Sequence, residues 1–158
     1  MLARGTNFAF VDLHPMFVGM FWGQASLEQG QQFVEASQAF LSSNDGPHCV
    51  LTIVTPDSTA PPSELRGLLR EAIGIIGESS TCYAGVILGS GVKASALRAI
   101  MGTLLLAMRR VSKGRVCGSV DDGLQWCASH LEGLDVARVR HAVEVHGPKD
   151  AVDSRRGA

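Results

Sequence analysis

The sequence has no excess of charge of either sign. Its 158 residues include 14 Lys and Arg and 15 Asp and Glu, so the formal net charge is −1. Proteins that bind nucleic acid or an anionic membrane through long-range attraction usually carry a basic excess. We therefore expect neither nucleic acid nor a membrane among the partners of this protein.

Long hydrophobic runs are also missing. The longest apolar run, residues 99–108, is about half as long as a membrane-spanning helix requires. The apolar stretch 8–22 is broken by polar residues and proline, and no small-residue cleavage pattern follows it. We therefore expect a cytoplasmic protein.

The cysteines lack the spacing of a metal or disulfide framework. Cys49, Cys82, Cys117 and Cys127 form no CxxC pair, and no histidine stands at metal-ligand spacing from them. Three of them fall in segments that predict strands, where a free cysteine behaves as a small buried hydrophobe. We expect buried free thiols, no metal site and no cofactor.

Catalytic motifs are missing as well. The sequence contains no GxSxG elbow, no HExxH and no Walker loop. Catalytic groups can still converge from distant positions, so an uncharacterised enzyme stays the weakest of the alternatives. We expect a non-enzymatic protein and can name no catalytic residue.

What the sequence does contain is the pattern of one globular α/β domain. Hydrophobic residues make up 46% of it, and 158 residues suffice for one core. Residues 8–13 and 16–22 predict a β-hairpin, and Ser26 with Gln29 predicts a capped helix start. The apolar runs 49–54 and 82–88 predict buried parallel strands, each followed by a helical pattern.

Alternating strands and helices predict a single, mainly parallel sheet with an N-terminal hairpin, in the order ββαβαβα. A short strand over 115–120 and a helix starting at Ser119 end this domain, which we place at residues 8–131. Residues 1–7 and 147–158 are expected to be flexible, and 132–146 to add a C-terminal helix. The predicted core contains Val50, Ile53, Leu69, Val86, Leu97, Met101 and Leu104.

The first candidate site is a glycine-rich turn between a strand and a helix. It fits the pattern GxGxxA, in which glycines let backbone amides approach a phosphate at a helix N-terminus. The alternative is a purely structural turn. The candidate ligand- or anion-binding residues are Gly89, Ser90, Gly91 and Lys93.

The second candidate site is the turn 55–62 with the start of the helix that follows. Short polar residues and prolines there can simply cap a helix or form a turn. Alternatively, the turn docks a partner, because loops at the carboxyl ends of parallel strands often present binding sites. The candidate partner-binding or phospho-switch residues are Asp57, Ser58, Thr59 and Ser63.

The element order and the segments 88–98 (LGSGVKASALR) and 116–126 (VCGSVDDGLQW) resemble the STAS and SpoIIAA-like domain family, which is related to bacterial anti-sigma factor antagonists. The resemblance covers about residues 8–131. The regulatory motif of that family is Asp-Ser-[Ser/Thr]-Gly, whose serine a partner kinase phosphorylates. Asp57, Ser58 and Thr59 match this motif, whereas Ala60 replaces its glycine.

The resemblance implies a STAS/SpoIIAA-like fold and a bacterial signalling role. Our expectation is a non-enzymatic regulatory or adaptor domain that acts by binding another protein, whose identity the sequence does not indicate. The sequence is also compatible with a homodimer. The alternative is a domain that binds a small ligand, nucleotide or anion at the glycine turn.

Overall fold

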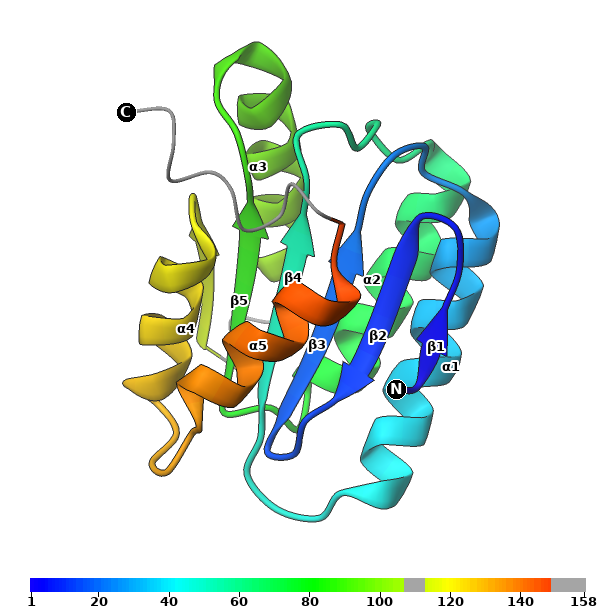
Figure 1. Ribbon diagram of the computed structural model, residues 1–158. Helices are drawn as coiled ribbons and strands as arrows, with labels where there is room; N and C mark the ends of the chain where they lie inside the picture. Colours follow the sequence, from blue (N-terminus) through cyan, green and yellow to red (C-terminus); the bar gives the residue numbers. More distant parts are fainter. Residues whose placement is uncertain (107–112, 149–158) are drawn as a thin grey trace.

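The computed structural model describes residues 1–106 and 113–148, and these form one six-stranded sheet with helices on both faces (Figure 1). The strands are β1 (Ala3–Arg4), β2 (Phe8–Asp12), β3 (Met16–Phe21), β4 (Cys49–Val54), β5 (Cys82–Ile87) and β6 (Lys113–Cys117). The helices are α1 (Leu27–Ser43), α2 (Ser63–Gly77), α3 (Gly91–Leu106), α4 (Val120–Ala128) and α5 (Val136–His146).

The strands lie in sequence order across the sheet, from β1 at one edge to β6 at the other. The hairpin of β2 and β3 is confirmed, and β3 to β6 run parallel. Because β1 adds a second antiparallel pair, the sheet is mixed and the prediction of a mainly parallel sheet is wrong. A two-residue strand such as β1 is too short to show any hydrophobic alternation.

The predicted order ββαβαβα is also wrong. The observed order is βββαβαβαβαα. The predicted order lacks β1, and it also leaves out β6, α4 and α5, although a strand over 115–120, a helix from Ser119 and a helix within 132–146 were each expected. Residues 1–7, expected to be flexible, include β1, and α5 falls within 132–146. Of the expected flexible tail 147–158, only Gly147 and Pro148 are among the described residues.

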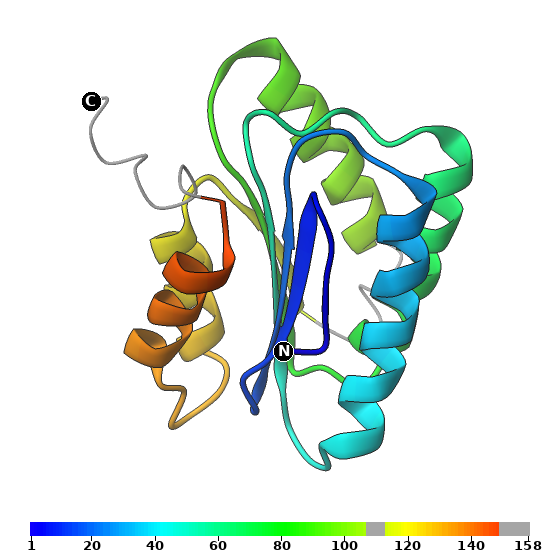
Figure 2. The ribbon, with the colours of Figure 1, turned by 45° about the vertical axis from the view of Figure 1, so that its right-hand side comes forward.

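Helices α1, α2 and α3 cover one face of the sheet, the three-helix face, and α4 and α5 cover the other, the two-helix face (Figure 2). Successive side chains of a strand point to opposite faces, so Val50 packs under the three helices and Leu51 under the two. Because helices bury both faces of the sheet, β4 is apolar along nearly its whole length instead of alternating between apolar and polar residues.

The predicted helix starts are confirmed at two places. Ser26 and Gln29 form a reciprocal capping box, in which each side chain accepts from the backbone N–H of the other residue. The hydroxyl of Ser119 accepts from the backbone N–H of Asp122 and caps α4. These bonds satisfy backbone donors that the first turn of a helix leaves free.

The predicted core is confirmed except at one position. Val50, Ile53 and Val86 are fully buried, and the three predicted residues of α3 are exposed by 8% or less. All four cysteines are buried, as expected. Leu69 is only half-buried, because it borders a space between the helices and the sheet.

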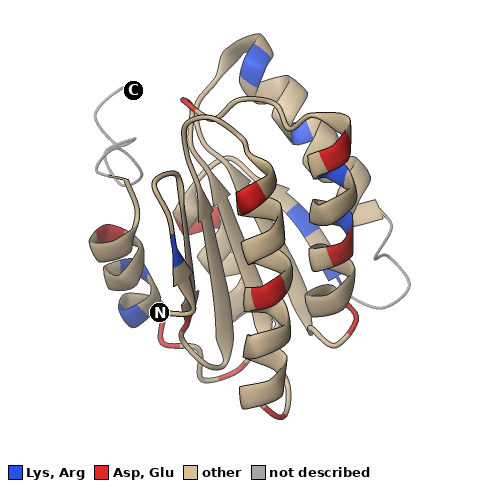
Figure 3. Ribbon diagram, turned by 90° about the vertical axis from the view of Figure 1, so that its right-hand side faces the viewer, with Lys and Arg blue, Asp and Glu red and all other residues tan. Residues whose placement is uncertain are grey.

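Charged residues lie mainly on the helices and in loops, and α2 carries both signs (Figure 3). Within the described part of the chain, every helix falls short of the length and apolar character that a membrane crossing demands.

Gly30 brings α1 and α2 into close contact. A Cβ atom built on Gly30 would lie 2.6 Å from Cδ1 of Leu65 and 2.8 Å from Cβ of Leu68. No alanine could therefore fit there without moving α2. Gly74, on α2, has open space at the corresponding point.

The substitution Gly30→Ala should lower the free energy of unfolding by about 1–3 kcal/mol, because overpacking outweighs the better helix propensity of alanine. Gly74→Ala is the matched control, and it should raise the free energy of unfolding by about 0.5–1 kcal/mol. Urea denaturation of both variants measures the difference. Equal stabilisation by the two substitutions would show that α1 and α2 are not in contact at Gly30.

Candidate functional site

A pocket opens on the three-helix face, between the sheet and helices α1, α2 and α3. Its unfilled space, counted out to the open mouth and including open solvent there, is about 620 Å³. We call it the three-helix pocket. Its lining residues are Thr52, Val54, Tyr83 and Ile87 on the sheet, Gln29, Phe33, Leu65, Leu69, Ile73, Leu97, Ile100, Met101 and Leu104 on the helices, and Phe21, Gly23, Ala25, Ser58, Thr59 and Pro61 in and beside the loops.

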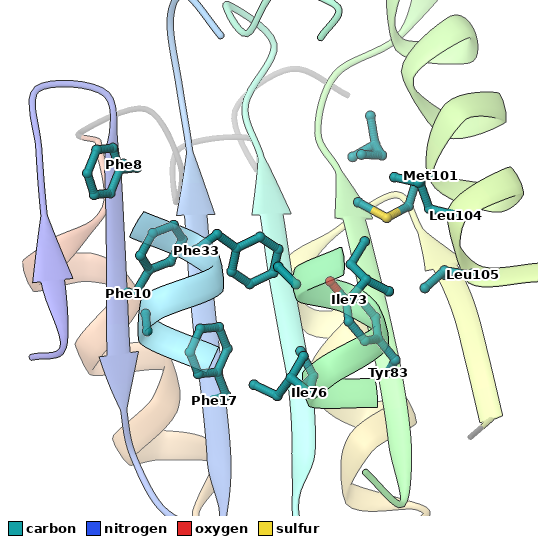
Figure 4. Packing of buried hydrophobic residues seen from close by; sticks show 14 of the residues in the cluster. Phe8, Phe10, Phe17, Phe33, Ile73, Ile76, Tyr83, Met101, Leu104 and Leu105 are labelled. Atoms are coloured by element: carbon teal, nitrogen blue, oxygen red, sulfur yellow. The ribbon is translucent and has the colours of Figure 1, made fainter. Parts of the chain in front are cut away.

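Two hydroxyl groups lie on the otherwise apolar sheet side of this pocket. Thr52 and Tyr83 are exposed by 1% and 0%, and neither hydroxyl makes a hydrogen bond of normal geometry with the described residues, although the two interact with each other. Figure 4 shows Tyr83 on β5 with Ile73 of α2 and Met101 of α3 around it. A buried polar group without a partner costs free energy, so these hydroxyls require an explanation.

Small residues flank Thr52 in the sheet. It pairs in register with Gly19 of β3 on one side and with Gly85 of β5 on the other. A Cβ atom on Gly85 would lie 2.7 Å from Cγ of Met101, so this glycine admits the Met101 side chain over the sheet. Because the side chains of this row are small, they leave space between the sheet and the helices next to the pocket.

The mouth of the pocket is closed on one side by two loops that are tied together. A carboxylate oxygen of Asp57 accepts from the backbone N–H of Gly23 at 3.1 Å, and the other accepts from the Thr55 hydroxyl. The hydroxyl of Thr59 accepts from the N–H of Ala25 at 2.8 Å. Asp57 and Thr59 thus hold the loop after β4 against the loop after β3.

Ser58 lies inside this arrangement and not on its surface. It is exposed by 5%, lines the pocket, and donates from its hydroxyl to the carbonyl of Phe21 at 3.2 Å. A kinase could reach this hydroxyl only if the loop opened. Ser63 is exposed at the first position of α2, outside the pocket.

The glycine turn lies beside the mouth but does not line the pocket. Gly89 and Gly91 have φ values of +85° and +87°, which only glycine adopts readily. Ser90 and Lys93 are exposed, and Nζ of Lys93 donates to the carbonyl of Pro56 at 2.9 Å. Lys93 thus connects the turn to the loop after β4, and anion binding at the turn stays a prediction.

Three cysteines come together under the two-helix face. The sulfur atoms of Cys49, Cys82 and Cys127 all lie within 4.8 Å of one another and are buried, an arrangement that could hold a metal ion. Hydrogen bonds from the thiols of Cys127 and Cys82 lower the pKa of Cys49 to about 4. The hydrogen bond with Cys49 raises the pKa of Cys127.

No protein-family model matches the chain, and no curated protein or solved structure is significantly similar to it. The resemblance to the SpoIIAA-like group therefore stays a prediction.

Sequence reasoning did not find the floor of the pocket or the cysteine cluster. Thr52 and Tyr83 are polar residues within strands that are otherwise apolar, and this contrast is the only sequence signal that points to the floor of the pocket. Cys49 and Cys82 each open one of two predicted neighbouring strands, so they could be expected side by side. The position of Cys127 opposite them depends on how α4 packs, which the sequence pattern does not specify.

Tyr83 is the only tyrosine of the chain, so its ionisation can be followed directly. Burial raises its pKa, and the nearby Thr52 hydroxyl offsets only part of this shift. In the unfolded chain the pKa of this tyrosine is about 10. Because the folded protein holds the phenol neutral to a higher pH, the free energy of unfolding stays at its full value below pH 10 and falls as the pH rises above 10.

We therefore expect absorbance of tyrosinate to appear only above pH 10 and together with unfolding. The variant Tyr83→Phe should lose less stability than the wild type between about pH 10 and 12. The measurements are an ultraviolet titration and circular dichroism on the same samples. Tyrosinate formed near pH 10 in protein that is still folded would contradict the burial of Tyr83.

Proposed function

We propose that this protein binds a small, mainly apolar molecule with one hydrogen-bonding group in the three-helix pocket. The observation that carries the proposal is the pair of buried hydroxyls, Thr52 and Tyr83, on the sheet side of an open apolar pocket. Neither makes a hydrogen bond of normal geometry with the described residues, although the two interact with each other. A ligand with one polar atom would pair with them and cover the apolar wall at the same time. Such a combination of apolar lining and few polar groups is typical of small-molecule sites.

The lining residues favour binding over catalysis. Among the described residues around the pocket there is no Asp, Glu, His, Lys, Arg or Cys. The nearby carboxylate of Asp57 already accepts two hydrogen bonds, one from Gly23 that joins the loops and one from Thr55 within its own loop. General acid–base catalysis needs a positioned group that exchanges protons near neutral pH, and the pocket offers only hydroxyls and one amide.

The regulatory function expected from the sequence is the second candidate, and it can use the same site. Ser58, Thr59 and Pro61 line the pocket and belong to the loop 55–62 that we propose as a docking surface. A ligand in the pocket would contact this loop from inside. Occupancy could thus change the loop that a partner protein contacts, because a ligand shifts conformations in which it binds more tightly.

The first test compares p-cresol with toluene, which has the same shape without the hydroxyl. We expect p-cresol to bind about tenfold more tightly, since a hydrogen bond contributes about 0.5–1.5 kcal/mol. The double variant Thr52→Val/Tyr83→Phe should bind both compounds alike. Dissociation constants come from nuclear magnetic resonance titration of the methyl groups of Leu69 and Leu104.

The position of the site is tested by filling it. Leu69→Trp places a larger side chain at the pocket wall and should abolish binding of both compounds. Val92→Trp is the matched control, because Val92 is 89% exposed on α3 and lies outside the pocket. Unchanged p-cresol binding by Leu69→Trp, or no binding by the wild type, would refute the proposed site.

Coupling between ligand and loop is tested by amide hydrogen exchange. The N–H of Thr59 donates to the carbonyl of Gly23 in the other loop, so it exchanges when the two loops separate. At a p-cresol concentration of ten times its dissociation constant, the exchange of this N–H should slow about tenfold. The N–H of Gly147, which donates to Val143 at the end of α5, is the internal control. Equal rates at Thr59 with and without bound p-cresol would exclude the regulatory coupling while leaving ligand binding intact.

A further inference from the structure

The three clustered cysteines belong to three separate elements. Cys49 and Cys82 are the first residues of β4 and β5 and are paired in register, with 3.0 Å between their sulfur atoms. Cys127 reaches them from the last turn of α4. The three sulfur atoms all lie within 4.8 Å of one another, which is close to the spacing of sulfur ligands around one metal ion.

Sulfur is the only donor in this cluster. Among the described residues, no His, Asp or Glu joins the group. The ring of His48, next in sequence to Cys49, lies near the carbonyls of Gly46 and Ile76 and against Phe40, so it is engaged elsewhere. All three cysteines are exposed by 0% and lie within an apolar cluster that includes Leu124.

We propose that Cys49, Cys82 and Cys127 form a three-sulfur binding site for a single copper(I) ion. Thiolate ligands select soft ions such as copper(I). Structural zinc sites are almost always four-coordinate, and catalytic ones complete three protein ligands with water. Here the described residues offer no fourth Cys, His, Asp or Glu ligand and the sulfurs are shielded from solvent, which favours an ion that is stable with three sulfur ligands. Each thiol that binds as a thiolate releases one proton to solvent.

The site is independent of the three-helix pocket. It lies under the two-helix face at the amino ends of β4 and β5, whereas the pocket lies on the other face and opens near their carboxyl ends. Copper binding can therefore fail while p-cresol binding succeeds, and the reverse also holds.

The test is an anaerobic titration of the whole chain with copper(I), in competition with bathocuproine disulfonate. We expect one ion per chain, and X-ray absorption should count three sulfur neighbours around it. Because the sulfurs are buried, the protein is also refolded from urea in the presence of copper(I), which removes any barrier to entry. Two or four sulfur neighbours, or no uptake after refolding, would overturn the proposal.

Single substitutions locate the ligands. Cys49→Ser, Cys82→Ser and Cys127→Ser should each weaken copper binding by at least about a hundredfold. Removing a residue that only hydrogen-bonds to a metal ligand already lowers metal affinity by up to about a hundredfold, and here the ligand itself is removed. Cys117→Ser is the matched control, because Cys117 is buried at 4% exposure on the same face but outside the group. Circular dichroism checks that each variant is folded. An equal loss in Cys117→Ser, or zinc binding more tightly than copper(I), would also overturn the proposal.

Discussion

The burial of both faces of β4 and β5 is the constraint on which the rest of the structure depends. These strands lie inside the sheet, and every residue of them is buried except Val54 at the end of β4. Apolar side chains on both faces require helices on both faces, because each face would otherwise meet water. The connections between parallel strands supply α1, α2 and α3 to one face. The chain after β6 supplies α4 and α5 to the other.

The pocket follows from how the three helices share their face. Gly30 lets α1 and α2 approach closely, whereas α2 and α3 contact each other little. Beneath the helices, Gly19, Thr52 and Gly85 form a row of small residues in the sheet, and the Met101 side chain packs against Gly85. Tight packing on one side of α2 and small residues in the sheet thus leave space beside the Thr52 and Tyr83 hydroxyls. Leu69 is half-buried for the same reason.

Much of the fold could be predicted because it depends on local patterns. The hairpin, the Ser26 capping box and the buried runs of β4 and β5 all follow from hydrophobic spacing and short-range hydrogen bonds. β1 could not be predicted, since two residues show no period. The candidate site was predicted only at its rim, through Ser58 and Thr59. Its floor depends on register, which places Thr52 between two glycines from other strands. No local pattern of β4 contains that information.

The pleat of the sheet separates the two proposed sites even where they are neighbours in sequence. Cys82 and Tyr83 are adjacent on β5, yet alternation sends the thiol under α4 and the hydroxyl toward α2 and α3. Cys49 and Thr52 are three positions apart on β4, an odd separation, so they also face opposite sides. An ion at the sulfurs would contact α4, whereas a ligand in the pocket would contact the loops after β3 and β4. The two proposed sites therefore share no residue, and a ligand bound at one would touch none of the side chains that line the other.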